Sequence, residues 1–163
     1  MALPLPPHGS DKLNLRLVSP SKAEELTTES ASAPKIVEQG ADVSTVRRLG
    51  DGALTPLDGF MTREVFDRVL DEEHILVDGK PFAWGIPLSL PVTDQEKAAL
   101  KMGEKALLVD TENTPLAVLE VEDLFQWDKK RYNMTLYGTE RQDHPVARIA
   151  LDDYRNWHVG GPI

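Results

Sequence analysis

The histidines are the first residues to test for chemistry, because imidazole is a versatile acid, base and metal ligand near neutral pH. The chain has four, spread along its length: His8, His74, His144 and His158. None has a second histidine four residues away, the spacing that places two imidazoles on one helix face to bind zinc. His74 follows three acidic residues, and a charged helix end explains this run better than a metal site. We therefore predict no metal site in this chain.

The glycine-rich segment 50–59 is the second candidate, since glycine loops can hold phosphate groups on their backbone amides. It contains Gly50, Gly52, Pro56 and Gly59. The Walker order and its lysine are missing, and so is the Gly-x-Gly-x-x-Gly of a dinucleotide site. We predict instead a structured turn, in which glycine supplies a positive φ and proline supplies stiffness.

Nucleophiles and acid–base pairs are the remaining candidates. The chain has no cysteine and no serine in a Gly-x-Ser-x-Gly turn. Acidic residues occur in short runs at 24–25, 71–73, 122–123 and 152–153, and such runs are typical of solvated surfaces. An acid–base pair needs burial or neighbouring charges to separate its two pKa values. We therefore predict no catalytic and no cofactor-binding residue, and we expect the scattered aromatic residues to pack in the core and at its rim.

Composition limits the classes of partner. The chain has 18 basic and 27 acidic residues among 163, a formal net charge of −9. A protein that neutralises nucleic-acid phosphates needs the opposite balance. No apolar run approaches the roughly 20 residues needed to cross a bilayer, and the first residues lack the basic and apolar parts of a signal peptide. We expect a cytoplasmic protein with no nucleic-acid and no membrane partner.

The elements of the N-terminal half can be predicted from local patterns. Residues 1–12 are rich in proline, glycine and serine and predict a flexible arm. Leucines alternate with polar residues at 13–18, which predicts a short strand. Residues 43–49 fit either a helix or a strand. Residues 62–70 give the clearest helix, with Thr62 as its cap and Val65, Phe66, Val69 and Leu70 on one face.

The C-terminal half has stronger β signals. The Asp78-Gly79 pair predicts a hairpin turn between strands at 75–77 and 82–90, and two flanking prolines place residues 88–90 at a sheet edge. A short helix should begin at Thr93 and end near Gly103. Aliphatic residues at 105–110 and 115–121 predict an antiparallel hairpin. The whole pattern predicts an α+β, mainly β fold with two or three short helices.

Five motifs occur in a fixed order along the chain. They are Arg48-Leu-Gly-Asp-Gly-Ala-Leu-Thr-Pro-Leu-Asp-Gly-Phe-Met61, Trp84-Gly-Ile-Pro-Leu-Ser-Leu90, Leu116-Ala-Val-Leu-Glu-Val-Glu-Asp-Leu-Phe125, Tyr137-Gly-Thr-Glu-Arg-Gln-Asp-His-Pro145 and Gly160-Gly-Pro-Ile163. In this order and spacing they resemble the N-terminal domain of the ATP sulfurylase (sulfate adenylyltransferase) family. Gly85 stands where that family usually has proline, and Arg141 stands where it usually has an acid.

The resemblance implies a fold and a reaction. The fold is a PUA-like, β-barrel-type domain over residues 13–163, after the arm at 1–12. The reaction transfers the adenylyl group of MgATP to sulfate, giving adenosine 5′-phosphosulfate and pyrophosphate. The family's catalytic motifs lie in a following α/β domain and do not occur in these residues, so the resemblance assigns no catalytic residue here. It implies that MgATP binds in the parent enzyme's catalytic domain, that this domain is the partner, and that the parent is a homo-oligomer.

The motif residues are expected to have structural roles. Four should fix a loop and anchor it to the core: Gly52, Pro56, Gly59 and Phe60. His144 and Pro145 should order the approach to the interdomain linker. Contact with the missing domain is expected around Tyr137, Gly138, Thr139 and His144. Exposed apolar surface is expected around residues 159–163 if a partner domain covers them. Two hypotheses remain open: an enzyme domain that is inactive alone, and a free-standing PUA-like binding or regulatory module.

Overall fold

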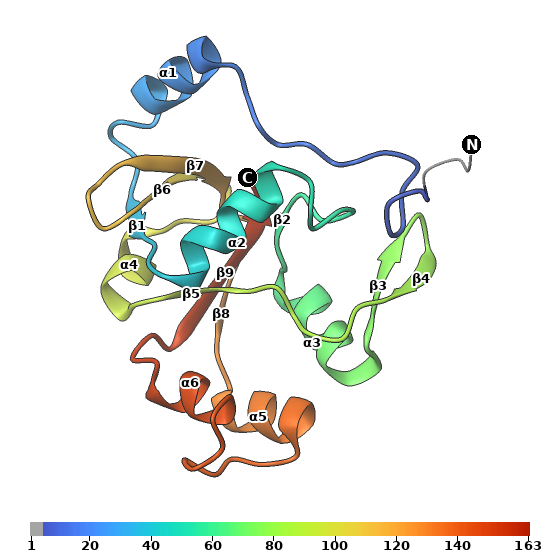
Figure 1. Cartoon of the computed structure of the whole chain (residues 1–163). Helices are drawn as coiled ribbons and strands as arrows, with labels where there is room; N and C mark the ends of the chain where they lie inside the picture. Colours follow the sequence, from blue (N-terminus) through green and yellow to red (C-terminus); the bar gives the residue numbers. More distant parts are fainter. Residues whose placement is uncertain (1–4) are drawn as a thin grey trace.

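The computed structural model describes residues 5–163, which form six helices and nine strands (Figure 1). The helices are α1 (Pro20–Glu29), α2 (Ala41–Gly50), α3 (Arg63–Glu72), α4 (Asp94–Ala99), α5 (Lys129–Tyr137) and α6 (Ala147–Asp152). The strands are β1 (Lys35–Val37), β2 (Gly59–Phe60), β3 (His74–Val77), β4 (Lys80–Ala83), β5 (Leu90–Val92), β6 (Lys105–Val109), β7 (Pro115–Glu120), β8 (Asp123–Gln126) and β9 (Trp157–Pro162). The predicted α+β, mainly β class is confirmed.

The strands form three sheets, and within the described residues these do not close into one barrel. In the first sheet β6 lies between β1, which is parallel to it, and β7, which is antiparallel. The second sheet is built around β9, which pairs antiparallel with β2, β5 and β8. The third is the hairpin β3–β4. The described residues form six helices rather than the two or three expected. Helices α4 and α6 have six residues each, and the other four have nine or ten.

Two apolar clusters make up the core. The larger joins the first sheet, α2 and β9, and its central side chains include Leu49, Leu90, Leu108, Leu119 and Val159. The smaller joins α3, the hairpin and β8 through residues such as Phe66, Val69 and Phe125. Each large aliphatic side chain buried in this way stabilises the fold by about 1.5–3 kcal/mol.

The most local predictions are confirmed. Helix α3 buries Phe66, Val69 and Leu70, as its apolar face predicted. In the β3–β4 turn Asp78 and Gly79 both have positive φ, as a two-residue hairpin of this sequence requires. Strands β6 and β7 form the predicted antiparallel pair.

The helix caps differ in part from the prediction. Thr93 caps α4 through a reciprocal capping box with Glu96. Thr62 stands at the start of α3, but its side chain accepts no capping hydrogen bond. The carboxylate of Asp123 takes this place and accepts from the Arg63 amide at 2.7 Å. Helix α4 ends at Ala99, and Gly103 has its positive φ in the turn that follows.

The predictions at the two ends of the chain had different outcomes. Residues 13–18 form no strand, because the amides of Arg16 and Leu17 donate to the Gly50 carbonyl at the end of α2 rather than to a neighbouring strand. Of the apolar surface expected at 159–163, Val159 is fully buried in the second sheet, whereas Pro162 and Ile163 are partly exposed.

The N-terminal arm contacts the hairpin. Residues 1–4 of the predicted arm lie outside the described residues. Beyond them, His8 Nε2 lies 2.8 Å from the Ala83 carbonyl oxygen at the end of β4.

None of the helices formed by residues 5–163 has both the length and the apolar composition of a membrane-spanning helix.

Candidate functional site

The loop between α2 and β2 holds the first group of motif residues. Gly52 has a φ of +77°, which favours glycine. The buried Thr55 hydroxyl donates to the Gly52 carbonyl at 2.6 Å and accepts from the Asn14 amide at 2.9 Å. The Asn14 side chain donates to the carbonyls of Pro56 and Leu57. The loop is thus closed on itself and ties the N-terminal arm to the core.

Glycines at the crossing of β2 and β9 allow the backbones to touch. A Cβ on Gly59 would overlap the Gly161 carbonyl and lie 2.5 Å from Pro162 Cα. A Cβ on Gly160 would lie 2.6 Å from the Met61 carbonyl oxygen. The neighbouring Phe60 side chain is buried in the larger core cluster. The first and last motifs of the sequence therefore meet here, and their glycines serve close packing.

The turn between α5 and α6 holds the second group. Gly138 ends α5 in the left-handed region at φ +65°. The Tyr137 ring stacks on His144 with centroids 5.7 Å apart, and His144 Nδ1 accepts from the Ala147 amide at the start of α6. Thr139 Oγ1 accepts from the Arg141 amide. Pro145 lies exposed in the same turn. These residues are brought together, and their contacts order the turn.

The two groups of motif residues lie at opposite ends of β9. Gly59 and Phe60 pair with Pro162 and Gly161, whereas α5 follows Gln126, which pairs with Trp157 at the other end (Figure 1). The predicted residues therefore form two structural clusters rather than one site.

Arg141, which stands where the resembled family usually has an acid, forms an ion pair with a neighbouring aspartate. Its guanidinium donates to Asp143 from both Nε, at 2.9 Å, and Nη2. This pair lowers the pKa of Asp143 through its side-chain hydrogen bond to Arg141. Both side chains are exposed, so the pair adds little to stability.

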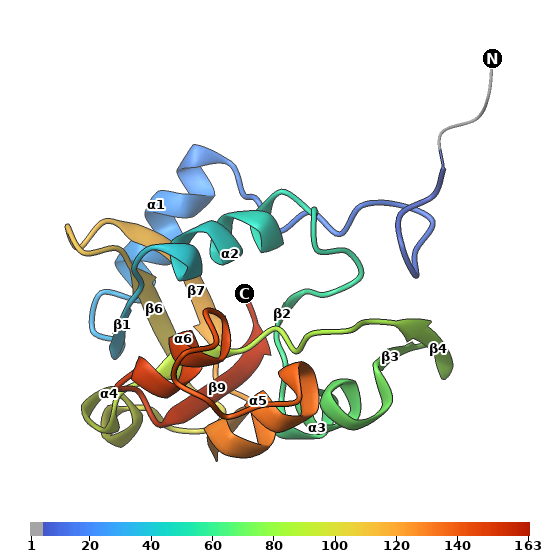
Figure 2. The same cartoon turned by 60° about the horizontal axis from the view of Figure 1, so that its bottom comes forward.

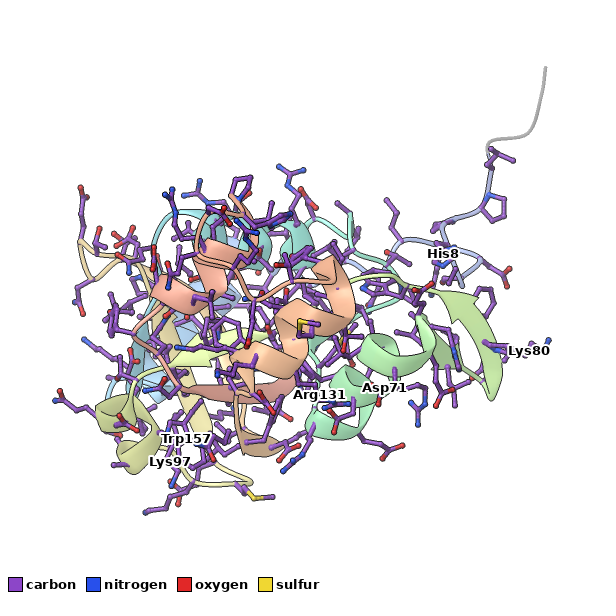
Figure 3. The ribbon with its side chains drawn as sticks, turned by 90° about the horizontal axis from the view of Figure 1, so that it is seen from below. His8, Asp71, Lys80, Lys97, Arg131 and Trp157 are labelled. Carbon is purple, nitrogen blue, oxygen red and sulfur yellow. The ribbon has the colours of Figure 1, made fainter. Side chains whose placement is uncertain are left out.

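Two arginines form ion pairs between elements that are distant in the sequence. Arg131 of α5 reaches Asp67 and Asp71 of α3, with its Nη2 donating to Asp71 at 2.7 and 2.9 Å (Figure 3). Arg155 is nearly buried and joins Asp42 of α2, at 2.8 Å, to Asp153, at 2.7 Å. Arg155 binds Asp153 through both Nε and Nη2, and a bidentate pair of this kind fixes geometry as well as adding energy.

His158 is a buried polar residue that sequence reasoning missed. It is fully covered and packs against Phe66, Phe125 and Trp127, whose ring centroid is 4.6 Å away. Neither ring nitrogen has a hydrogen-bond partner among the residues described. Burial lowers the pKa of His158 to about 3, so the imidazole is neutral at pH 7. The sequence gives no signal of this burial, because a polar residue between Trp157 and Val159 is expected to lie on the solvent face of an alternating strand.

Glu38 is the second such residue. It follows β1, is fully covered, and within residues 5–163 neither carboxyl oxygen has a hydrogen-bond partner. Burial, with a further contribution from Asp42, raises the pKa of Glu38 to about 8. The carboxyl group is therefore mostly protonated at pH 7. A single acid after a three-residue strand gives no sequence signal of burial.

Potential metal ligands do not cluster in the part of the chain that the structure describes. Across residues 5–163 no three His, Cys, Asp or Glu side chains converge as metal ligands. A metal site built from three such side chains is therefore not formed within this range.

Known proteins are similar to this chain over almost its whole length. The PUA-like domain family matches residues 5–163. The sulfate adenylyltransferase of Pyropia yezoensis is 46% identical over 100% of this chain and 38% of its own length. Those of Synechococcus sp. (strain JA-3-3Ab) and Pyrococcus abyssi are 33% and 34% identical over 98% and 96% of the chain, and 39% of their own lengths.

A solved structure is also similar to almost the whole chain. The hexameric APS kinase from Thiobacillus denitrificans matches 96% of this chain and 26% of its own length, with a TM-score of 0.70 and 27% identity. The chain spans about two fifths of the length of the curated relatives it matches. With the family matched from residue 5 to residue 163, the chain belongs to the PUA-like domain family, in the form found in sulfate adenylyltransferases.

Proposed function

We propose that this chain is the non-catalytic domain of a sulfate adenylyltransferase, the enzyme that transfers AMP from MgATP to sulfate to give adenosine 5′-phosphosulfate and pyrophosphate. The observation that carries the proposal is the 46% identity of the whole chain to 38% of the Pyropia yezoensis enzyme. MgATP would bind in the remaining part of such an enzyme, which is the proposed partner of this domain.

The use of the motif residues supports a scaffold role. Adenylyl transfer needs cations and oriented donors to stabilise charge on the phosphoryl oxygens. Here the motif glycines pack backbone against backbone, and His144 and Tyr137 hold a turn. These residues are engaged within the domain, which makes them suited to support a site elsewhere in the enzyme.

The proposal is tested with the purified 163-residue chain. Incubated with ATP, sulfate, Mg²⁺ and pyrophosphatase, it should form adenosine 5′-phosphosulfate only at the background rate. Formation far above background, retained after rigorous purification, would overturn the assignment of catalysis to another domain. The matched control is the full Pyropia yezoensis enzyme under the same conditions.

An oligomeric parent is part of the same proposal. The solved neighbour is described as a hexamer, which supports assembly in proteins that carry this domain. Sedimentation velocity of a full-length enzyme containing this domain should show an oligomer, and a strictly monomeric enzyme would contradict it. The cytoplasmic location remains a prediction from composition.

A further inference from the structure

A groove of about 610 Å³ is lined by the N-terminal segment, α1 and α2, among other elements. The backbone of the N-terminal segment runs from α1 past α2 (Figures 1 and 2). The walls of the groove come from residues 15–18, α1, α2, β6 and β7, and from the end of β9. Its volume falls within the range of about 300–1,000 Å³ found for binding sites. Segments far apart in the sequence therefore build one continuous hollow.

Apolar side chains at this groove are left open to solvent. Leu15 is 60% exposed, Leu17 is 72% exposed, and Val18 is about half exposed. Leu116, Ala117 and Val118 of β7 are partly exposed and also line the groove. Single exposed leucines are common on protein surfaces, but several on one concave face mark an interaction site.

The charge of the groove is opposite to that of the molecule. Arg16, Arg47 and Lys105 line it, against a single carboxylate, Glu120. Arg16 Nε donates to the main-chain oxygen of Ile163 at 2.7 Å, which holds its guanidinium over the end of β9. None of the three cations forms an ion pair with another described residue. A chain with a net charge of −9 therefore has a groove that is both cationic and apolar.

The exposed apolar side chains and the positive charge of the groove together define the chemistry of the segment that would bind in it. Aliphatic side chains would cover the exposed leucines and exclude water, and excluding water strengthens an ion pair to a nearby arginine. A purely apolar segment would desolvate three cations against a single carboxylate, which is costly. A segment that combines aliphatic side chains with carboxylates satisfies both.

We propose that this groove docks an acidic, aliphatic segment from the remaining part of the sulfate adenylyltransferase. The inference rests on the proposed function and names the surface and the chemistry of its domain contact. The relatives supply the partner, because the matched region is only about two fifths of their length. The contact would join the N-terminal segment, α2 and β7 of this domain to the catalytic part.

The absence of cysteine from the chain allows a direct test. In a chimaera, this chain replaces the matching 38% of the Pyropia yezoensis enzyme. Leu17→Cys reports on the groove, and Met102→Cys, 66% exposed in the turn after α4, is the matched control. Maleimide labelling at each position is followed by peptide mass spectrometry, in the isolated chain and in the chimaera.

The labelling rate at position 17 should fall at least about tenfold from the isolated chain to the chimaera, because thiol reactivity requires access, while position 102 keeps its rate. An unchanged rate at position 17 would overturn the docking proposal. Equal protection at both positions would also overturn it, because the protection would not be specific to the groove.

Charge reversal tests the chemistry of the contact. Arg47→Glu with Lys105→Glu should restore most of the labelling at position 17 in the chimaera, whereas Lys80→Glu on the β3–β4 hairpin should not. Unchanged protection after the double reversal would contradict the acidic occupant. Synthesis of adenosine 5′-phosphosulfate by the same chimaera reports on the proposed function separately, so the two claims can fail independently.

Discussion

At the scale of single residues, the domain depends on glycines that no other residue can replace. Gly59, Gly160 and Gly161 lie where β2, β9 and the end of β7 approach most closely. Gly85 provides a contrast, since a Cβ there would meet no atom within 4 Å. The same residue type is thus required at one motif and free at another.

Gly59→Ala should destabilise the domain by more than about 3 kcal/mol or prevent folding, because the new Cβ meets backbone atoms that cannot move aside. Gly85→Ala should change the free energy of unfolding by less than about 0.5 kcal/mol. Urea denaturation followed by circular dichroism measures both. Equal stability of the two variants would show that the β2–β9 contact is wrong.

Glu38 should make the protein less stable in mild alkali. Its folded pKa of about 8 lies above the ordinary value of 4.5, so the folded state holds the proton more tightly. The associated stability is complete below about pH 4.5 and is lost as the pH rises through 8. Glu38→Gln should flatten this part of the stability curve, while Glu112→Gln in an exposed turn should not. Urea denaturation between pH 5 and 9 measures the slope of the free energy of unfolding against pH. If both variants kept the slope of the parent protein, Glu38 would not be a buried neutral acid.

His158 should act in the opposite direction. Its folded pKa of about 3 lies below the ordinary 6.5, so the unfolded chain binds the proton more tightly. The stability is complete above about pH 6.5 and falls by up to about 1.4 kcal/mol per pH unit as the pH drops towards 3. His158→Leu should reduce this slope, and His8→Gln, at an exposed position, should leave it. Thermal unfolding between pH 4 and 7 provides the test, and an unchanged slope in His158→Leu would argue against it.

At the scale of secondary-structure elements, two helices begin with threonine but are capped differently. Thr93 and Glu96 form a complete capping box at the start of α4. At the start of α3, Asp123 supplies the acceptor in place of Thr62. Identical residues at equivalent positions therefore differ in their contribution.

Thr93→Ala should lower the free energy of unfolding by about 1 kcal/mol, the usual loss for a missing N-cap. Thr62→Ala is the matched control and should cost only a few tenths of that amount. Chemical denaturation of the three proteins compares them directly. A greater loss for Thr62→Ala would show that Asp123 does not provide the cap.

Local patterns explain which elements could be predicted from the sequence. Helix α3 and the β6–β7 hairpin were predictable because their apolar residues follow one helix face or two neighbouring strands. Strand β9 was not, since Gly160 and Gly161 resemble a turn until their distant partners are known. The alternation at 13–18 predicted a strand wrongly, because the Gly50 carbonyl and the Thr55 hydroxyl accept its amide hydrogens.

The motif residues could be selected from the sequence by their resemblance to a family, and their structural role was a hypothesis. Their clustering at two ends of β9 required the fold. The buried Glu38 and His158 could not be predicted as neutral groups, because burial depends on how β1 and β9 are covered by elements distant in sequence.

At the scale of the whole molecule, an acidic domain with two tightly packed motif clusters presents one cationic, apolar groove. Its whole length matches about two fifths of sulfate adenylyltransferases. The proposed function accounts for these properties together, since such a domain would support catalysis performed elsewhere in the same enzyme.

The most direct measurement is the rate of adenosine 5′-phosphosulfate formation by the chimaera that carries this chain in the Pyropia yezoensis enzyme. We expect a rate within about tenfold of the unmodified enzyme, because the chain is 46% identical to the part that it replaces and the proposal assigns it no catalytic residue. The isolated chain should stay at background. A chimaera that folds and assembles but forms no product, at saturating ATP and sulfate, would contradict the assignment of this chain to that enzyme.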